Sequence, residues 1–397
     1  MVADGSGDLT REHLTERLRA SGALPAGRVT AVHAGEVKNT ILSTIVSYRV
    51  EYSSDVPPHA PTRMILKGAG SGIDPLFRRA SELEVEFYRQ AAPLTPPGLL
   101  PVCYDAEVTH AGVRVLLEDL SDTHMVVTTW PLPPALEVCE RIVDTWAAFH
   151  GFWWRHPRLG HGVGAFLDEA ALAEIGVQRR QRYARFADTL SDRLPPAARS
   201  LYDRLLDTLD RVVTPAFVYE NCTLVHGDAH VWNLLYPRGG VASGVRLIDW
   251  ASWRLGRGVA DIAYMMAVHW YPERRARLES SLLDRYHAGL CAGGVKGYSR
   301  QQLQHDYRQA VLGALMIPVW QQTLGIPPAV WWSHLNRLRA AVDDLDCTRR
   351  LSCRRRFGGV RGPCAEGWGP DRSYSDRGSG SGRTDPACGR PARHAPS

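Results

Sequence analysis

Apolar and polar side chains alternate along the first third of the chain. Between positions 41 and 52 the even positions are mostly apolar or aromatic, as at Val46, Tyr48 and Val50, while Ser47 and Arg49 occupy odd ones. A period of two is typical of a strand with one buried face. Shorter runs predict further strands at 62–67, 102–107 and 113–118, and helical spacing predicts helices at 11–20 and 80–91.

After Ser121 the spacing of apolar residues becomes helical. Helices are expected at 135–154, 169–189, 196–212, 259–269, 274–290, 300–320 and 330–350. One strand pair, around 234–248, is expected to interrupt them. A strand-rich first third followed by a helical remainder predicts an α+β protein of two lobes, 1–120 and 121–350, joined near 118–121.

The segment 351–397 shows no apolar period and is rich in Arg, Gly, Ser and Pro, so it is predicted to be disordered. It holds nine Arg and four acidic residues, which accounts for the whole formal charge of +5. The rest of the chain is neutral on balance. A nucleic-acid partner is therefore not predicted for the folded part.

No segment reads as a membrane span. The most apolar stretch, 311–332, is interrupted by Gln321, Gln322 and three prolines. The N-terminus is polar and lacks the apolar region of a signal peptide, so a cytoplasmic protein without a membrane partner is expected. The eight Cys form no CxxC pair, so neither a zinc site nor a disulfide framework is predicted. No pattern specifies an oligomeric state.

The strongest chemical pattern lies at 224–249. His226 is followed by Asp228 and then by Asn233, which leads into a short apolar run; a turn and a second apolar run end at Asp249. The two runs predict a β-hairpin, whose ends bring Asn233 and Asp249 side by side. Such oxygen ligands, together with substrate phosphates, suit Mg²⁺. Asp228, on the loop leading into the hairpin, is placed to accept a hydroxyl proton, as in kinase phosphoryl transfer.

Lys67 ends a predicted strand and is one of only three Lys among 47 basic residues. An ammonium at a strand end can reach nucleotide phosphates, and a helix carboxylate can fix it, with Glu84 and Glu86 as candidates. The alternative interpretation is an exposed charge at the end of a strand.

A weaker candidate precedes the period-two strand. The run from Gly35 to Thr40 could form a turn that covers the phosphates, with Asn39 and Thr40 as contacts. A single Gly is far from a glycine-rich loop, and an ordinary hairpin turn is the alternative.

These segments resemble the aminoglycoside phosphotransferase and choline kinase superfamily, including its ecdysteroid-kinase-like group. The resemblance spans about residues 30–345 and is most specific at 224–263. It rests on His226-Gly-Asp228 with Asn233 five residues later, on Leu247-Ile-Asp249-Trp250, and on the run from Trp253 to Asp261.

The resemblance implies a bilobal protein-kinase-like fold that uses ATP and Mg²⁺. Asp228 would be the catalytic base and His226 would brace its loop, with Asp261 holding the loop backbone from below. Asn233 and Asp249 would be the metal ligands. The resemblance also favours Glu84 as the partner of Lys67. It places the segment containing Glu118 and Leu120 between the lobes, where backbone groups would bind the adenine edge.

The expected activity is transfer of the γ-phosphoryl group of ATP to a hydroxyl of a small molecule. An antibiotic, an amino alcohol such as choline, a sugar and a sterol-like alcohol all remain open as acceptors. The alternative is a catalytically inactive pseudokinase that binds a nucleotide or a partner. Against it stand the intact Lys67, Asp228, Asn233 and Asp249. The Trp residues of the helical region fit either an acceptor pocket or core packing.

Overall fold

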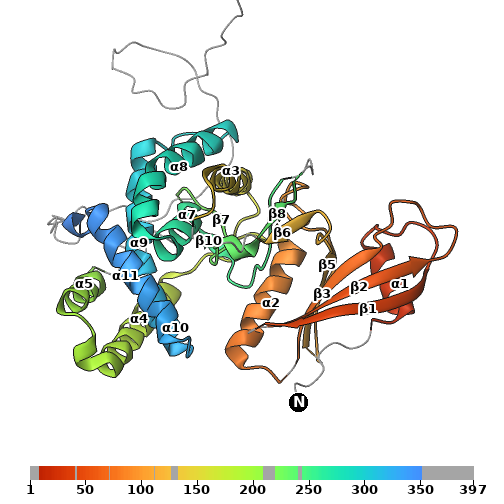
Figure 1. Cartoon of the computed structure of the whole chain (residues 1–397), viewed down its shortest axis with the longest axis horizontal. Helices are drawn as coiled ribbons and strands as arrows, with labels where there is room; N and C mark the ends of the chain where they lie inside the picture. Colours follow the sequence, from red (N-terminus) through yellow and green to blue (C-terminus); the bar gives the residue numbers. More distant parts are fainter. Residues whose placement is uncertain are drawn as a thin grey trace, which may run out of the picture.

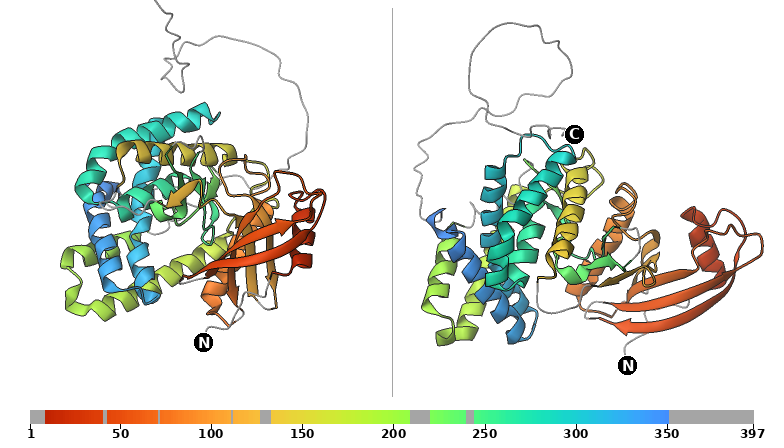
Figure 2. Two further views of the ribbon diagram at one scale, coloured as in Figure 1. Left: turned by 45° about the vertical axis from the view of Figure 1, so that its right-hand side comes forward. Right: turned by 45° about the horizontal axis from the view of Figure 1, so that its top comes forward.

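The computed structural model describes residues 9–350, apart from 41–42, 71, 111, 127–132, 209–219 and 240–243. The predicted disordered segment 351–397 lies outside the described residues. The first third of the chain forms a strand-rich part, and the remainder forms a mainly helical part beside it (Figures 1 and 2). In the described part of the chain, no helix has both the length and the apolar character that a membrane crossing requires.

The strand-rich part is a five-stranded antiparallel sheet with two helices. Its strands follow the order β1-β2-β3-β5-β4. Their bounds are β1 (Val29–Asn39), β2 (Thr44–Tyr52), β3 (Arg63–Gly70), β4 (Cys103–Thr109) and β5 (Gly112–Glu118). Helix α1 (Arg11–Ala20) precedes the sheet and α2 (Pro75–Gln90) connects β3 to β4.

The two faces of this sheet belong to different hydrophobic cores. Leu66 of β3 and Leu116 of β5 are paired neighbours, and they pack with Leu18 of α1 in a small core. Val115 lies on the opposite face and packs with Phe87 of α2 in a large core that continues into the helical part. Because side chains alternate along a strand, Lys67 shares the α2 face with its pairing partner Val115.

The position of the β1–β2 turn corrects an expectation. Residues 35–39 belong to β1 and not to a turn, since Asn39 pairs with Thr44 and, beyond it, the N–H of Thr40 donates to the carbonyl of Ser43. The register shifts between Ala34 and Val37, as at a bulge around Gly35. These residues are exposed, so backbone pairing with β2 forms the strand without the alternating pattern that sequence analysis requires.

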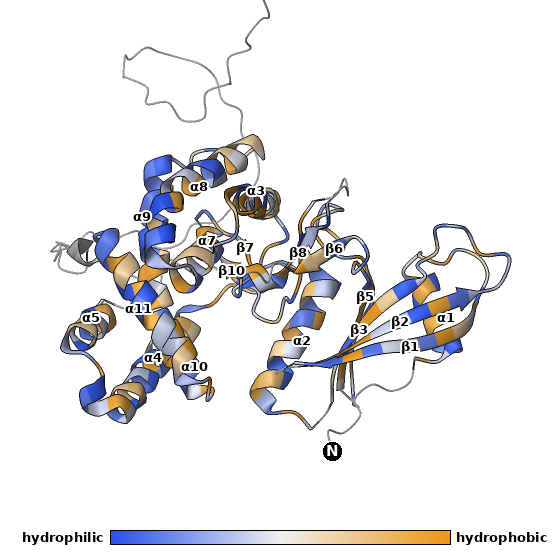
Figure 3. Ribbon diagram, viewed as in Figure 1, coloured by the Kyte–Doolittle hydropathy of each residue, from blue (hydrophilic) through white to orange (hydrophobic). Residues whose placement is uncertain are grey.

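The helical part contains eight α-helices among the described residues. Apolar side chains run along most of α3, which Figure 3 colours by hydropathy. The helices are α3 (Leu136–Trp153), α4 (Glu169–Leu190), α5 (Pro196–Asp207), α7 (Val259–Ala263), α8 (Pro272–Ala292), α9 (Arg300–Ala314), α10 (Met316–Thr323) and α11 (Pro328–Asp344). A π-helical turn, Tyr264–Val268, continues α7.

Two departures from the predicted helix bounds have a clear physical cause. The helix expected at 300–320 is divided at Leu315 into α9 and α10. Pro318 has no N–H to offer the carbonyl of Ala314, which removes one helical hydrogen bond at this point. The helix expected at 80–91 begins earlier, at Pro75, because the side chain of Asp74 caps it by accepting from the N–H of Leu76.

More short strands accompany the helices than the single expected pair. The predicted hairpin exists as β8 (Leu234–Pro237) and β9 (Arg246–Leu247), with β6 (His124–Val126) added beside β8. Strands β7 (Thr223–Val225) and β10 (Arg254–Gly256) form a second antiparallel pair. Strands of two to four residues are too short to show a period, and this is why sequence analysis missed three of them.

Candidate active site

The loop that follows β7 is held by its backbone. The N–H groups of His226 and Gly227 donate to the two carboxylate oxygens of Asp261, at 2.7 and 2.9 Å. Gly227 has a φ of +84°, and a Cβ at this position would lie 2.3 Å from the carbonyl oxygen of Ser252. Only glycine fits such a left-handed position with a close backbone neighbour.

Asp261 is itself enclosed in a buried network. It is 1% exposed, and its Oδ2 also accepts from Nε2 of His150 at 3.2 Å. Nδ1 of His150 lies 2.8 Å from the hydroxyl of Tyr286. Burial alone would raise the pKa of Asp261, but His150, His226 and the loop amides outweigh it and lower the pKa. The carboxylate therefore stays charged and fixes the loop from below.

His226 connects this loop to the hairpin. Its Nδ1 accepts from the N–H of Asp228 at 3.2 Å, so the ring proton resides on Nε2, which donates to the carbonyl of Ile248 at 2.8 Å. The ring is buried, and burial lowers its pKa. A neutral His226 therefore ties Asp228 to the residue that precedes Asp249.

The carboxylate of Asp228 receives hydrogen bonds from two side chains. Oδ1 accepts from the hydroxyl of Tyr264 at 2.6 Å, and Oδ2 accepts from Nδ2 of Asn233 at 3.1 Å. Nε2 of His230 lies 3.4 Å from Oδ2. Burial would raise the pKa of Asp228, but His230 and Tyr264 outweigh it and hold the pKa well below its usual range. Asp228 is thus an ionised, oriented acceptor.

The hairpin brings the two candidate metal ligands together. Leu234, next to Asn233, pairs with Leu247, and the N–H of Ile248 donates to the carbonyl of Asn233 at 3.1 Å. Asn233 uses Nδ2 for Asp228, which leaves its amide oxygen for a cation. Asp249 has a φ of +68°, a strained conformation of the kind that gathers at functional sites.

Lys67 joins the two parts of the protein at this point. Its Nζ lies 2.8 Å from Glu84 of α2 and 2.8 Å from Asp249. Burial opposes the charged ammonium, but these two carboxylates outweigh it and raise the pKa of Lys67. Burial raises the pKa of Glu84, and the ammonium counteracts that rise. Asn233 and Asp249 offer an amide oxygen and a carboxylate, and these oxygen donors suit Mg²⁺.

Aromatic packing holds α2 against the segment that follows Asp249. The rings of Phe87 and Trp250 are stacked, with centroids 3.8 Å apart. Nε1 of Trp253 donates to the carbonyl of Leu83 at 2.6 Å. Glu84, which lies between Leu83 and Phe87, is thereby positioned toward Lys67, the partner that the family resemblance favoured for it.

The remaining predicted nucleotide contacts lie at the ends of two strands or just after them. Asn39 and Thr40 are exposed at the β1–β2 end, where Oδ1 of Asn39 accepts from the hydroxyl of Thr44, itself paired with Gly68. Glu118 ends β5, and its carboxylate accepts from the N–H of Val102. The carbonyl of Leu120 accepts from the N–H groups of Thr123 and His124.

Several residues around Asp228 were missed by sequence analysis. Tyr264 follows Asp261 by three residues, and this helical spacing could have signalled it. The ring centroid of His269 lies 5.3 Å from that of His230 and 4.8 Å from that of His334. Nε2 of His269 and Nδ1 of His230 are buried without a hydrogen-bond partner among the described residues. No local pattern links three His from separate segments.

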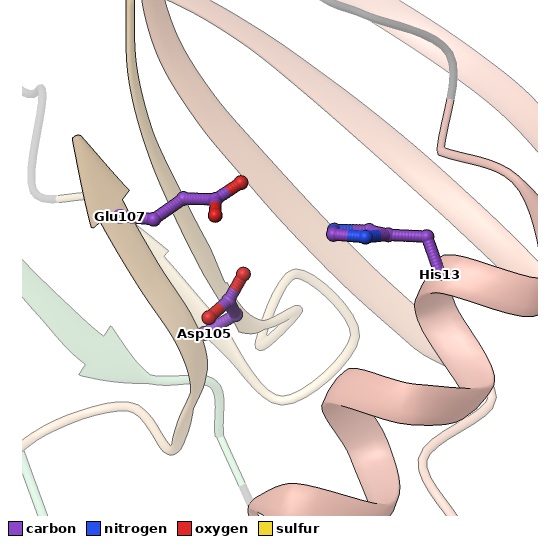
Figure 4. A group of neighbouring side chains, drawn as sticks. All are labelled: His13, Asp105 and Glu107. Carbon is purple, nitrogen blue, oxygen red and sulfur yellow. The ribbon is translucent and has the colours of Figure 1, made fainter. Parts of the chain in front are cut away.

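A second group of possible metal ligands lies far from this loop, on α1 and β4. It comprises His13, Asp105 and Glu107 (Figure 4). Arg17 lies 3.6 Å from Asp105 and 3.8 Å from Glu107, and Arg114 also pairs with Glu107. Two guanidinium groups already balance these carboxylates, so the arrangement is that of an ion-pair cluster.

Comparison with known proteins gives evidence on the family and the fold of this chain. The model of a phosphotransferase enzyme family matches residues 60–299. No curated protein sequence matches the chain. Among solved structures, a microcompartment-associated aminopropanol kinase is 16% identical with a TM-score of 0.51, covering 81% of this chain and 93% of that one. This likeness shows the kinase-like fold, with the strand-rich and helical lobes that the sequence predicted.

Two antibiotic kinases are also similar. A macrolide 2′-phosphotransferase from Brachybacterium faecium is 14% identical with a TM-score of 0.43, covering 83% of this chain and 97% of that one. The wild-type aminoglycoside 2′-phosphotransferase-IIIa, in its GDP complex, is 13% identical with a TM-score of 0.47, covering 85% and 99%.

Proposed function

The chain belongs to this phosphotransferase enzyme family, and on that premise we propose that it uses ATP and Mg²⁺ to phosphorylate a hydroxyl of a small molecule. The observation that carries the proposal is the Lys67 ammonium, held between Glu84 and Asp249 while Asn233 binds Asp228. One connected network thus joins a phosphate-binding cation, a candidate metal site and a candidate base. We place the reaction in the cytoplasm.

In this mechanism Lys67 binds the nucleotide phosphates, and Glu84 keeps its ammonium in place. Asn233 and Asp249 would hold Mg²⁺, which neutralises phosphate charge. Asp228 orients the acceptor hydroxyl. Because the pKa of Asp228 is low, it is a weak base, and it accepts the proton only once bond formation to phosphorus makes the hydroxyl acidic. His226 and Asp261 position the loop that carries Asp228.

The acceptor classes suggested by the family are an antibiotic, an amino alcohol, a sugar or a sterol-like alcohol. The competing proposal is a pseudokinase that binds nucleotide without transfer. No feature of the site favours this second proposal, since Lys67, Asp228, Asn233 and Asp249 all lie in the network described above.

A thermal-shift measurement with Mg²⁺ and ATP tests the nucleotide site. A ligand that binds only the native state adds about 2.7 kcal/mol of stability at a hundredfold excess over Kd. We expect a clear rise in Tm for the wild type and a reduced rise for Asp249→Asn. Asn tolerates the left-handed backbone of position 249, so this change removes charge without adding strain. Asp188→Asn, at an exposed position of α4, is the control.

Release of ADP then separates the two proposals. Asp228→Asn should lower the transfer rate by about 10²–10⁴ while nucleotide binding is retained. Unchanged turnover in this variant would contradict the role of Asp228. Nucleotide binding without ADP release, in the presence of acceptors from every class, would favour the pseudokinase.

A further inference from the structure

The Lys67 ammonium lies on the same carboxylate that is a candidate metal ligand. Its Nζ donates to Oδ1 of Asp249 at 2.8 Å, the distance of a strong, charge-assisted hydrogen bond. The side chain of Lys67 is 14% exposed, and that of Asp249 is 36% exposed. Water therefore screens this contact only in part, and charges placed beside it interact more strongly than they would on an open surface.

The two ends of this contact differ in how freely they can move. Asp249 follows Ile248, whose N–H donates to the carbonyl of Asn233, so the backbone that carries the carboxylate is fixed. Lys67 holds its charge at the end of a flexible four-carbon side chain. Its ammonium also has a second partner, since Oε2 and Oε1 of Glu84 lie 2.8 and 3.0 Å from Nζ. Separation of the pair therefore takes place by movement of the ammonium.

A divalent cation at Asp249 would meet this ammonium. Both bind the same carboxylate, and two positive charges on one carboxylate repel each other over a few ångströms. A metal ion that binds before the nucleotide must either displace the ammonium or share the carboxylate with it, and both cost binding free energy. Phosphate oxygens remove the conflict, because they offer the ammonium another partner and add negative charge beside the metal.

We propose that the ion pair between Lys67 and Asp249 closes the metal site until nucleotide phosphates draw the ammonium away, so that the divalent cation binds together with the nucleotide and not ahead of it. The inference rests on the proposed function and adds a regulation of that same site. Because coupling between two ligands is reciprocal, the metal strengthens nucleotide binding by the same factor. The ion pair thus keeps Asp249 from collecting a metal ion that carries no phosphoryl donor.

Mn²⁺ alone is the probe for the closed site. It takes the same oxygen ligands as Mg²⁺, and its free aquo ion is counted by electron paramagnetic resonance. The full-length protein is titrated without nucleotide. We expect weak binding in the wild type, strengthened roughly tenfold or more in Lys67→Met, because one positive charge beside the site is removed. Lys296→Met, at an exposed position, should bind Mn²⁺ like the wild type.

Further variants separate the release of Asp249 from a general loosening of the site. Lys67→Met leaves Glu84 buried without its partner, which lowers stability and offers a second carboxylate to the cation. In Lys67→Met/Glu84→Gln neither charge of that pair remains, and the gain in Mn²⁺ affinity should persist. In Lys67→Met/Asp249→Asn the gain should vanish. Glu84→Gln alone leaves Lys67 on Asp249, so it should bind Mn²⁺ no more tightly than the wild type.

Coupling to the nucleotide is measured with saturating ADP. The same titration without protein corrects for Mn²⁺ bound by ADP in solution. We expect ADP to strengthen Mn²⁺ binding to the wild type roughly tenfold or more, and to strengthen it less in Lys67→Met/Glu84→Gln, where no ammonium has to be drawn away.

Three outcomes would overturn the proposal. The first is the absence of any gain in Mn²⁺ affinity in both Lys67→Met and Lys67→Met/Glu84→Gln. The second is an equal gain in Glu84→Gln, because the ammonium would then not be the obstacle. The third is a gain that persists in Lys67→Met/Asp249→Asn. Failure of the proposed function itself is recognised separately, by the lack of any Tm shift with Mg²⁺ and ATP in the wild type.

Discussion

The two sides of Asp228 differ in how completely their polar groups are satisfied. On the loop side, Asp261 accepts from two amides and from His150, and both ring nitrogens of His226 are hydrogen-bonded. On the other side, where an acceptor hydroxyl would approach and which is called the acceptor side, Nδ1 of His230 and Nε2 of His269 are buried without hydrogen-bond partners among the described residues. Buried polar groups are rarely left unpaired. Nε1 of Trp146 and Nε1 of Trp250, whose rings pack on His226, also lack partners among the described residues. The ionisable groups of the loop side are nevertheless hydrogen-bonded and hold its geometry, whereas those of the acceptor side leave two imidazole nitrogens for a ligand.

The largest expected effect comes from breaking the loop side at its centre. The carboxylate of Asp261 accepts three hydrogen bonds. In Asp261→Asn, the amide NH₂ group would point at one or more of these donors and could not accept from them. Removing one partner from a buried charged network costs about 3–5 kcal/mol. We expect a large loss in urea-unfolding free energy and a loss of activity in whatever remains folded. Asp188→Asn, which is exposed, should change stability by less than about 0.5 kcal/mol.

As the pH falls, we expect groups on the acceptor side to lower the stability of the protein before those on the loop side do. Burial, with the positive charge of Arg337, lowers the pKa of His334 to about 4, below the unfolded value of 6.5. Between these values the unfolded state binds more protons, so stability is full above pH 6.5 and is lost as the pH falls toward 4. The loss from this one group is about 3 kcal/mol. Loop carboxylates with lowered pKa values contribute only at more acidic pH.

His334→Gln tests this assignment. Unfolding free energies measured at pH 7 and pH 4.5 should differ less in the variant than in the wild type. An unchanged pH dependence would contradict the buried, neutral state of His334.

A matched pair of buried histidines compares the two sides directly. His150→Phe leaves the Tyr286 hydroxyl and one Asp261 acceptor site without their partner, which should cost about 2 kcal/mol. His269→Phe removes a ring whose Nε2 has no hydrogen-bond partner in the part of the chain that the structure describes, so it should change stability by less than about 1 kcal/mol. Both are measured by urea unfolding at pH 7. Equal losses would remove the distinction between the two sides.

The loop side is also the part that sequence analysis described well. Residues from His226 to Asp261 lie within one continuous stretch, and the hairpin between Asn233 and Asp249 follows from local apolar runs and a turn. The bilobal kinase-like fold and the phosphotransferase family are confirmed. The individual roles given to the site residues stay predictions.

The acceptor side could not be derived in the same way. Its groups are Tyr264 and His269, at the π-helical turn, with His230 before it and His334 of α11, and they meet only in the folded protein. The β1 extension was missed for a related reason, since exposed residues at 35–39 pair through backbone groups that carry no residue pattern.

The division of the sheet between two hydrophobic cores determines where the chain can be truncated without loss of folding. A fragment ending at the predicted lobe boundary of 120 would keep α1 and its small core intact. It would also expose Phe87 and Val115, whose cover includes Trp250 from the other side of that boundary. Such a fragment should aggregate unless the remainder of the chain is co-expressed with it, so the two lobes are parts of one cooperative folding unit.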